Sequence, residues 1–312
     1  MELLNPRKAY GEALVNLGTT DENIVVLEAD LGKSTMTNMF GEKFPERYFQ
    51  VGIAEQNMAS VAAGLALTGK TAFINSFAVF STGRAYDQIR SSVCIPKLNV
   101  KICGSSAGFS DYGDGKTHQS VDDIALMRVL PNMMVFSPVD AVETTKIMEA
   151  ISKYNGPCYI RINRNDMPVF TDPDDEYYIG KMPLIREGRD VVVFATGIMV
   201  SRAVEAAEML EKEGVSVRVV NVSTIKPLNI EALKEYTKSV KGIVTAEEHS
   251  IYGGLGSAVC EALSNSRLPI EIIGVNDTFG RSAENYDLLL EHYHLTSEDI
   301  ASRIRLVLKK DS

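Results

Sequence analysis

The chain has 312 residues, of which 45% are apolar and 23% charged, so it is long enough for two globular domains with ordinary cores. Its 32 basic and 41 acidic residues give a formal net charge of −9, which argues against binding to nucleic acid or to an anionic membrane. No apolar run reaches the roughly 18 residues that span a bilayer, and the first residues turn polar too early for a secretory signal. These features predict a cytoplasmic protein.

Cysteine and histidine usage gives no sign of a metal centre. The four cysteines are far apart and form no CxxC pair, which predicts buried free thiols at Cys94, Cys103, Cys158 and Cys260. The four histidines contain no HExxH motif. We therefore expect no metal ligands in this chain.

In the first half of the chain, apolar strand-like runs alternate with helix-like stretches. The predicted strands, in chain order, are 24–30, 71–77, 98–103, 133–137 and 158–162. The predicted helices are 6–17, 55–68, 82–93, 120–128 and 140–154. Because these strands are apolar on both faces, they predict a parallel sheet covered by helices.

The segment TDPDDEYYIGKMP (171–183) breaks this rhythm and predicts a linker, or alternatively an irregular crossing strand. Alternation then resumes with predicted strands at 190–197, 216–222, 242–248 and 270–275. Predicted helices in this half are 198–213, 229–239, 253–263 and 296–310, and Thr296 followed by Asp299 resembles an N-cap of the last one. We therefore predict two α/β domains, residues 1–170 and 187–312, joined by a linker at 171–186.

The most informative segment is VGIAEQNMASVAAGLAL (51–67), which places a carboxylate in a probable core helix. Glu55 shares a small, apolar face with the residues at helical spacing from it: Met58, Ala59, Ala62, Leu65 and Ala66. Burial raises a carboxyl pKa unless a partner compensates, and such a group suits proton sharing with a ligand nitrogen. The alternative is a first-turn acid near solvent that complements the helix dipole.

A polar loop, GFSDYGDGKTHQS (108–120), follows one of the predicted strands. Open α/β sheets bind ligands at the carboxyl ends of their strands, so Asp114 and His118 are candidate ligand-binding residues; a solvated turn is the alternative. The GDG within this loop also opens the thiamine-diphosphate motif. That motif needs asparagines further along, where residues 140–150 have none, so we expect no metal binding from this GDG.

Arginines and phenylalanines at strand ends are weaker candidates. Arg164 in RINRNDMP (161–168) has the geometry to bind a phosphate or carboxylate in a bidentate way, but surface ion pairing is the commoner fate. Arg7 has less support on its own. Phe73, Phe77 and Phe80 cluster around one strand end, where core packing is the default and a ring-stacking pocket the alternative.

Taken together, these segments resemble the C-terminal section of transketolase. In the first half the matching pieces are EADLGKS (28–34), GIAEQNMA (52–59), FAVF (77–80), YGDGKTHQ (112–119) and RINRNDMP (161–168). In the second half they are VVVFATG (191–197), TIKPLN (224–229) and EEHSIYGGLG (247–256). The resemblance implies an α/β fold: a thiamine-diphosphate-type pyrimidine-binding domain with a parallel sheet, then a smaller α/β transketolase C-terminal domain.

The resemblance also implies where thiamine diphosphate binds. Glu55 matches the glutamate that contacts N1′ of the aminopyrimidine and activates the cofactor, which serves as the electron sink for carbon–carbon cleavage. Phe77 and Phe80 match the aromatic pocket around the pyrimidine, whereas Ile74 replaces a further aromatic of that pocket. Asp30 matches an acid near the cofactor at the subunit interface.

By the same resemblance, three residues match positions that hold the sugar phosphate: Arg7, Ser34 and Arg164. Asp114 and His118 match groups that contact the sugar hydroxyls and the two-carbon intermediate, with His118 as a catalytic residue. Ser106 stands where many full-length transketolases carry a substrate-contacting histidine. This departure bears on the choice of donor sugar more than on the cofactor.

The implied activity is transfer of a two-carbon ketol unit from a ketose phosphate to an aldose phosphate, in the pentose phosphate pathway. The resemblance covers no diphosphate-binding domain, so we expect a separate N-terminal subunit that holds the diphosphate and Mg²⁺ (or Ca²⁺), in an α2β2 heterotetramer. Alternatives are a subunit resembling 1-deoxyxylulose-5-phosphate synthase, a 2-oxo-acid dehydrogenase β subunit, and a non-catalytic binding module of the same fold.

Overall fold

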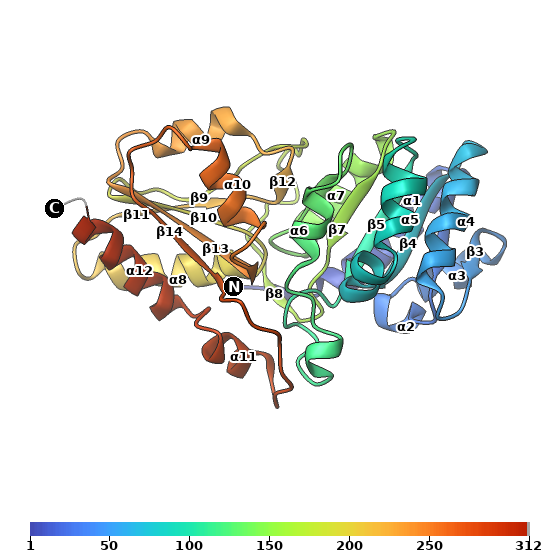
Figure 1. The fold of residues 1–312 in the computed structure, drawn as a ribbon, viewed down its shortest axis with the longest axis horizontal. Helices are drawn as coiled ribbons and strands as arrows, with labels where there is room; N and C mark the ends of the chain where they lie inside the picture. Colours follow the sequence, from blue (N-terminus) through green and yellow to red (C-terminus); the bar gives the residue numbers. More distant parts are fainter. Residues whose placement is uncertain (311–312) are drawn as a thin grey trace.

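In the computed structural model, which describes residues 1–310, the chain folds around two β-sheets that lie side by side along its long axis (Figure 1). The larger sheet has seven strands in the order β12-β6-β7-β5-β4-β2-β3. The smaller sheet has five strands in the order β14-β13-β10-β11-β9. A separate two-stranded ribbon pairs β1 (Leu3–Leu4) with β8 (Met167–Pro168).

Six strands of the larger sheet run parallel: β2 (Ile24–Glu28), β3 (Tyr48–Gln50), β4 (Thr71–Phe77), β5 (Val100–Ser105), β6 (Met134–Phe136) and β7 (Cys158–Arg161). Every residue of β2, β4, β5 and β7 is buried, as expected for strands that are covered on both faces. The prediction of a helix-covered parallel sheet is therefore confirmed.

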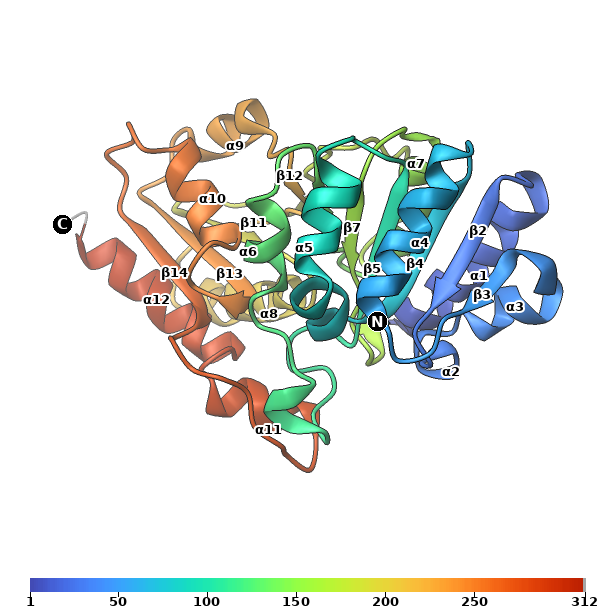
Figure 2. The same cartoon turned by 45° about the vertical axis from the view of Figure 1, so that its right-hand side comes forward.

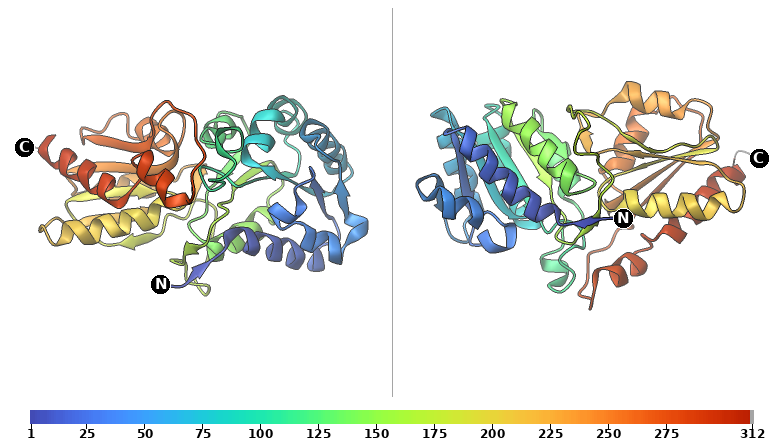
Figure 3. Two further views of the ribbon diagram at one scale, coloured as in Figure 1. Left: turned by 90° about the horizontal axis from the view of Figure 1, so that it is seen from below. Right: turned by 180° about the vertical axis from the view of Figure 1, so that it is seen from behind.

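Helices cover both faces of this sheet. One face packs against α4 (Glu55–Leu67), the segment 79–94 and α6 (Asp123–Arg128). The opposite face packs against α1 (Pro6–Thr20), α3 (Asn38–Lys43) and α7 (Ala141–Lys153), and Figure 3 shows α1 beside α7 on the side seen from behind. Cys94, Cys103 and Cys158 are buried in these layers, and all four cysteines are free thiols.

The second domain repeats the three-layer plan on a smaller scale. Four of its strands are parallel: β10 (Val191–Ala195), β11 (Val217–Asn221), β13 (Gly242–Ser250) and β14 (Ile270–Val275). The edge strand β9 (Leu184–Arg186) is antiparallel. One face packs against α8 (Met199–Glu211), α11 (Tyr286–His292) and α12 (Ser297–Lys310), and the other against α9 (Ile230–Thr237) and α10 (Leu255–Ala262).

Side-chain caps fix several of the helix starts. The Asn5 carboxamide oxygen accepts the Arg7 and Lys8 N–H groups before α1, and the Asp140 carboxylate accepts the Glu143 N–H before α7. Before α12, the Thr296 hydroxyl accepts the Asp299 N–H, and the Asp299 carboxylate in turn accepts the Thr296 N–H. The predicted N-cap at Thr296 is confirmed as a reciprocal capping box.

Some elements differ from the sequence-based expectation. The predicted helix at 82–93 is two π-helical turns, Val79–Arg84 and Ile89–Cys94, on either side of the short α5 (Tyr86–Gln88). Strand β12 (Thr224–Lys226) belongs to the second half of the chain but pairs antiparallel with β6 in the first domain's sheet. No helix among residues 1–310 is long and apolar enough to cross a bilayer.

Candidate active site

The topology brings most of the candidate residues to one edge of the larger sheet. Asp30 follows β2, Phe77 ends β4, Ser106 follows β5, and Arg164 follows β7. Because these strands are parallel, their carboxyl ends meet at the same edge, where open α/β sheets bind ligands. Glu55 begins α4, shortly after the end of β3.

Glu55 is buried, with one carboxylate oxygen bound and the other without a partner. Only 1% of its surface is exposed, as expected for an acid on an apolar helix face. It also lies in the first turn of α4, which is the position that the alternative interpretation gave it. Arg84 donates a hydrogen bond from Nη1 to Oε1 at 2.8 Å. Oε2 is buried and accepts no hydrogen bond from residues 1–310, so it can accept one from a ligand.

Next to Arg84, the partner of this carboxylate, lies a pair of phenylalanine rings, Phe77 and Phe80, which we call the aromatic group. The Arg84 guanidinium lies 4.4 Å from the centre of the Phe80 ring, and the Phe80 and Phe77 rings stack with centroids 6.2 Å apart. The His118 ring meets both edge-on, at 5.3 Å from Phe80 and 6.2 Å from Phe77. Ile74 instead lies in the core cluster between the sheet and α4.

A second set of candidates lines a cavity of about 410 Å³ that includes Arg7, Asp111, Asp114 and Arg164. Arg164 Nη1 lies 2.6 Å from Asp111 Oδ2, and Arg7 Nη1 donates to the backbone carbonyl of Ser34 at 2.8 Å. The guanidinium groups of Arg7 and Arg164 therefore line the same cavity, and only that of Arg164 is in direct contact with a carboxylate, that of Asp111, within residues 1–310. Such an arrangement is suited to binding an anion.

The electrostatics of this cavity follow from burial and from the two like charges. Burial lowers the pKa of Arg7, and the nearby Arg164 lowers it further. Burial raises the pKa of Asp111, although the Arg164 guanidinium opposes that shift. An added anion would relieve the repulsion between the arginines.

Two candidates, Asp30 and Ser106, adopt left-handed backbone conformations that non-glycine residues rarely adopt, with φ of 64° and 52°. Asp30 is exposed, and its backbone N–H donates a hydrogen bond to Gln50 Oε1 at 2.7 Å. Ser106 is fully buried, and its hydroxyl has no partner among residues 1–310. Backbone strain of this kind is concentrated at ligand-binding sites.

Sequence reasoning missed two partners, Arg84 and Asp111. Arg84 lies in the irregular 79–94 segment, where no periodic pattern marks a residue that faces Glu55. Asp111 lies three residues before Asp114 in the same polar loop, so its position there was the only available signal. His249 is buried and contacts backbone groups: its Nε2 accepts the Ala125 N–H, and its Nδ1 lies 2.8 Å from the Ser250 carbonyl oxygen.

Comparison with known proteins identifies the fold. Residues 3–169 match the family model of the transketolase pyrimidine-binding domain, and residues 180–300 match that of the transketolase C-terminal domain. The chain belongs to the transketolase family. Transketolases depend in general on thiamine diphosphate, and the transketolase fold predicted from the sequence is thereby confirmed.

Several similar proteins match this chain over nearly the whole length of both. A protein provisionally named a transketolase C-terminal section, from Methanocaldococcus jannaschii, is 46% identical over 98% of this chain and 96% of its own. A 6-deoxy-6-sulfo-D-fructose transketolase subunit from Clostridium sp. is 40% identical over 94% and 91%. A solved structure described as a split-gene transketolase in an inactive β4 tetramer matches at 47% identity and a TM-score of 0.90, over 99% of both chains.

The residues at this edge fit the pyrimidine end of thiamine diphosphate. Glu55 offers a buried oxygen without a partner, and the stacked Phe77 and Phe80 rings offer an apolar surface for a flat heterocycle. The buried hydroxyls of Ser76 and Ser105, near the ends of β4 and β5, also have no hydrogen-bond partner among residues 1–310. Within residues 1–310, no three His, Cys, Asp or Glu side chains are close enough together to hold a metal ion.

Proposed function

We propose that this chain is the pyrimidine-side subunit of a transketolase that moves a two-carbon ketol unit from a ketose phosphate to an aldose phosphate. The observation that carries the proposal is the buried Glu55 Oε2, which has no hydrogen-bond partner among residues 1–310. Arg84, the partner of the other carboxylate oxygen, lies over the Phe80 ring, which stacks with Phe77. When bound, thiamine diphosphate supplies the electron sink for carbon–carbon cleavage. Glu55 would share a proton with N1′ of the aminopyrimidine, and Arg84 would orient the Glu55 carboxylate.

The cavity around the two arginines supports a phosphorylated substrate. Arg7 and Arg164 would bind the phosphate of the sugar together with Ser34, because paired guanidinium groups match its charge and geometry. Asp114 and His118, on the loop between this cavity and the aromatic group, would bind the sugar hydroxyls, and His118 would act in catalysis. Asp30 and Ser106 would contact the cofactor and the donor sugar, respectively.

We further propose that a separate diphosphate-binding subunit completes the site in an α2β2 complex and holds Mg²⁺ (or Ca²⁺). Large apolar side chains are exposed on and just before α4, the helix that begins with Glu55: Ile53 is 74% exposed, Val61 38% and Leu67 73%. Large exposed apolar side chains along one helix are a candidate interaction surface. The similar split-gene chain is described as inactive when it forms a β4 tetramer, which supports dependence on a partner.

Reconstitution tests this proposal. The chain is purified alone and together with an N-terminal-type transketolase subunit, and ketol transfer is measured from xylulose 5-phosphate to ribose 5-phosphate with thiamine diphosphate and Mg²⁺. We expect activity only from the complex, and we expect Glu55→Gln to lower kcat by about 10²–10⁴-fold without loss of assembly. Glu208→Gln, which changes an exposed glutamate on α8, serves as the matched control.

Three outcomes would contradict the proposal. Near-normal rates in Glu55→Gln would remove the assigned role of that residue. Tight, Mg²⁺-dependent cofactor binding and turnover by the chain alone would remove the need for a partner. Turnover of pyruvate or another 2-oxo acid in place of the ketose phosphate would assign the complex to the synthase or dehydrogenase alternative.

A further inference from the structure

The ends of the loop 106–120, which carries Asp114 and His118, are buried in the core of the second domain. Phe109, near the start of the loop, and Val121, just after its end, pack in the same apolar cluster as residues of β10 and β13. The Phe109 ring also stacks on Tyr293, which follows α11, with centroids 4.2 Å apart and planes 11° apart. Figure 2 shows this green loop beside the red segment around α11.

Polar contacts hold the loop to the second domain along its length. The Phe109 N–H donates to Glu248 Oε1 at 2.7 Å, near the start of the loop. In the middle, the Ala283 N–H donates to the Tyr112 carbonyl at 2.9 Å. Near its end, the Gln119 carboxamide donates to two carbonyls, those of Asp111 at 3.1 Å and Arg281 at 3.0 Å.

Glycines allow the two surfaces to approach this closely. Gly108 and Gly115 have φ of +62° and +77°, and a Cβ at these positions would lie 2.4 Å from Glu248 Cδ and 2.5 Å from Ser282 Oγ. A Cβ at Gly280 would lie 1.9 Å from Gln119 Oε1. Side chains other than hydrogen at these positions would therefore push the loop away from the second domain.

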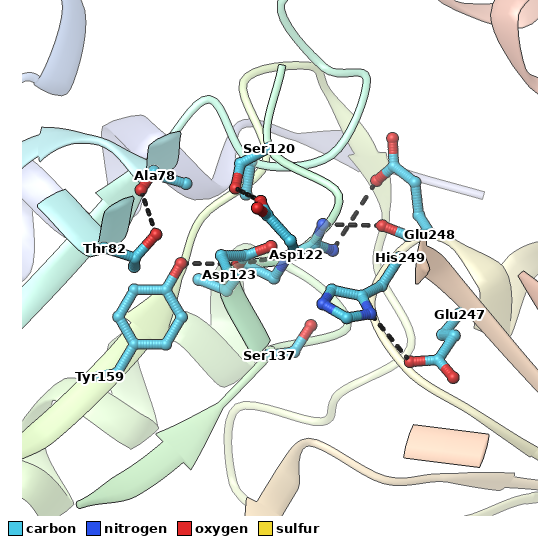
Figure 4. Close-up of polar contacts among 12 residues, drawn as sticks. Ala78, Thr82, Ser120, Asp122, Asp123, Ser137, Tyr159, Glu247, Glu248 and His249 are labelled. Atoms are coloured by element: carbon cyan, nitrogen blue, oxygen red, sulfur yellow. Dashed lines mark hydrogen bonds and ion pairs between the residues drawn. The ribbon is translucent and has the colours of Figure 1, made fainter. Parts of the chain in front are cut away.

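Glu248 is buried at the centre of this contact. Its backbone carbonyl accepts a hydrogen bond from Arg161 Nη2 at 2.7 Å, and its Oε2 lies 3.9 Å from Arg161 Nη1. The same arginine donates to Asp123 Oδ2 at 2.9 Å. The Tyr159 hydroxyl donates to that oxygen as well, and Figure 4 shows Tyr159 beside Asp123. Glu248 therefore joins the loop to the strand β7 that leads to Arg164.

We propose that Glu248 is a positioning residue for ketol transfer. It acts from the second domain by holding the Phe109 N–H, and with it the loop whose Asp114 and His118 face the substrate. A loop that is already held in its working conformation loses less conformational entropy when the substrate binds. It also keeps its side chains aligned with the reacting atoms. The catalytic part of the inference rests on the proposed function, whereas the attachment of the loop does not.

Three substitutions test this role. Glu248→Ala removes the acceptor for Phe109, Glu248→Gln keeps an acceptor oxygen at the same place, and Gly108→Ala disturbs the contact from the loop side if Glu248→Ala does not fold. The matched control is Glu143→Ala. Glu143 is also buried at the domain boundary, but it binds the Val139 N–H at 2.7 Å and the Asn221 side chain at 3.0 Å, away from the loop.

Two measurements separate the attachment of the loop from catalysis. Hydrogen exchange of amides 108–120 in the isolated chain is expected to rise about tenfold or more in Glu248→Ala and to stay near the wild-type rate in Glu248→Gln and Glu143→Ala. In the reconstituted complex, Glu248→Ala is expected to raise the KM for the sugars about tenfold, with thiamine diphosphate affinity unchanged, and Glu248→Gln to restore most of that loss.

Either measurement can overturn the inference. Unchanged loop exchange in Glu248→Ala, or an equal rise in Glu143→Ala, would show that Glu248 does not hold the loop. Faster exchange with an unchanged KM would show that the attachment does not serve catalysis. A wild-type complex without ketol transfer would refute the proposed function instead, and the exchange data would still decide whether Glu248 holds the loop.

Discussion

Arg7 and Arg164 share a cavity in which their positive charges repel each other. Asp111 balances Arg164 through a contact of 2.6 Å, whereas Arg7 donates to the neutral carbonyl of Ser34. Arg7 therefore has no carboxylate in direct contact within residues 1–310, although Asp111 and Asp114 line the cavity, and its guanidinium remains available to a phosphate. A charge-assisted hydrogen bond is worth roughly 1.5–3 kcal/mol, so each arginine can contribute about one to two orders of magnitude in affinity.

This charge balance predicts the effect of Arg164→Ala. We expect the substitution to raise the KM for phosphorylated sugars about 10- to 100-fold, and to change the KM for the unphosphorylated sugars much less. Steady-state kinetics of the reconstituted complex with both kinds of acceptor provide the measurement. Arg305→Ala, on the surface of α12, is the control. Equal effects of Arg164→Ala on the two acceptors would remove this residue from the phosphate site.

At the same scale, the sequence pointed to candidate site residues more readily than to the side chains that contact them. Glu55 could be found because a lone acid interrupts an apolar helix face, and His118 because its loop follows a parallel strand. Arg84 and Asp111 could not be assigned as partners of Glu55 and Arg164, because the local spacing of residues does not reveal contacts between distant parts of the sequence. Nothing in the sequence indicated that Glu248 binds the loop 106–120, which begins more than a hundred residues earlier in the chain.

Among the elements, predictions succeeded where the chain shows a clear period or an apolar run. The parallel strands β2, β4 and β5 are buried along their whole length, and such strands can be found from composition alone. Strand β12 was missed because its three residues depend on pairing with β6, a partner that no local pattern indicates. Residues 82–93 were predicted as one helix from their helical pattern, whereas the segment 79–94 forms two π-helical turns on either side of α5.

The capping box of α12 allows a test at the level of a single element. Thr296→Ala removes the hydroxyl that accepts the Asp299 N–H at 3.2 Å, and we expect a loss of about 1 kcal/mol in the free energy of unfolding. Ser297→Ala, one residue further along, is expected to have a much smaller effect because no cap depends on its side chain. Chemical denaturation measures both, and equal losses would show that the box contributes nothing specific to the start of the helix.

Across the whole molecule, buried carboxylates connect the two domains. Glu143 on α7 of the first domain accepts hydrogen bonds from Asn221 on β11, and Glu248 on β13 binds the loop of the first domain. Burial raises the pKa of each to about 7, and that of Glu28 in the first domain to about 7 as well. The packing of the domains against each other is thus tied to the protonation of acids that lie between them.

The pH dependence of stability follows from these shifts. Between the usual glutamate pKa of 4.5 and the folded value of about 7, the folded chain holds protons that the unfolded chain releases. The stabilisation is therefore complete below about pH 4.5 and is lost as the pH rises through 7, with a slope approaching about 1.4 kcal/mol per pH unit for each group. Chemical denaturation at pH 5 to 7.5 should show a shallower fall for Glu143→Gln than for the wild type, because glutamine does not titrate. Glu208→Gln, on the exposed face of α8, should keep the wild-type slope, and a Glu143→Gln slope equal to it would show that Glu143 does not titrate in this range.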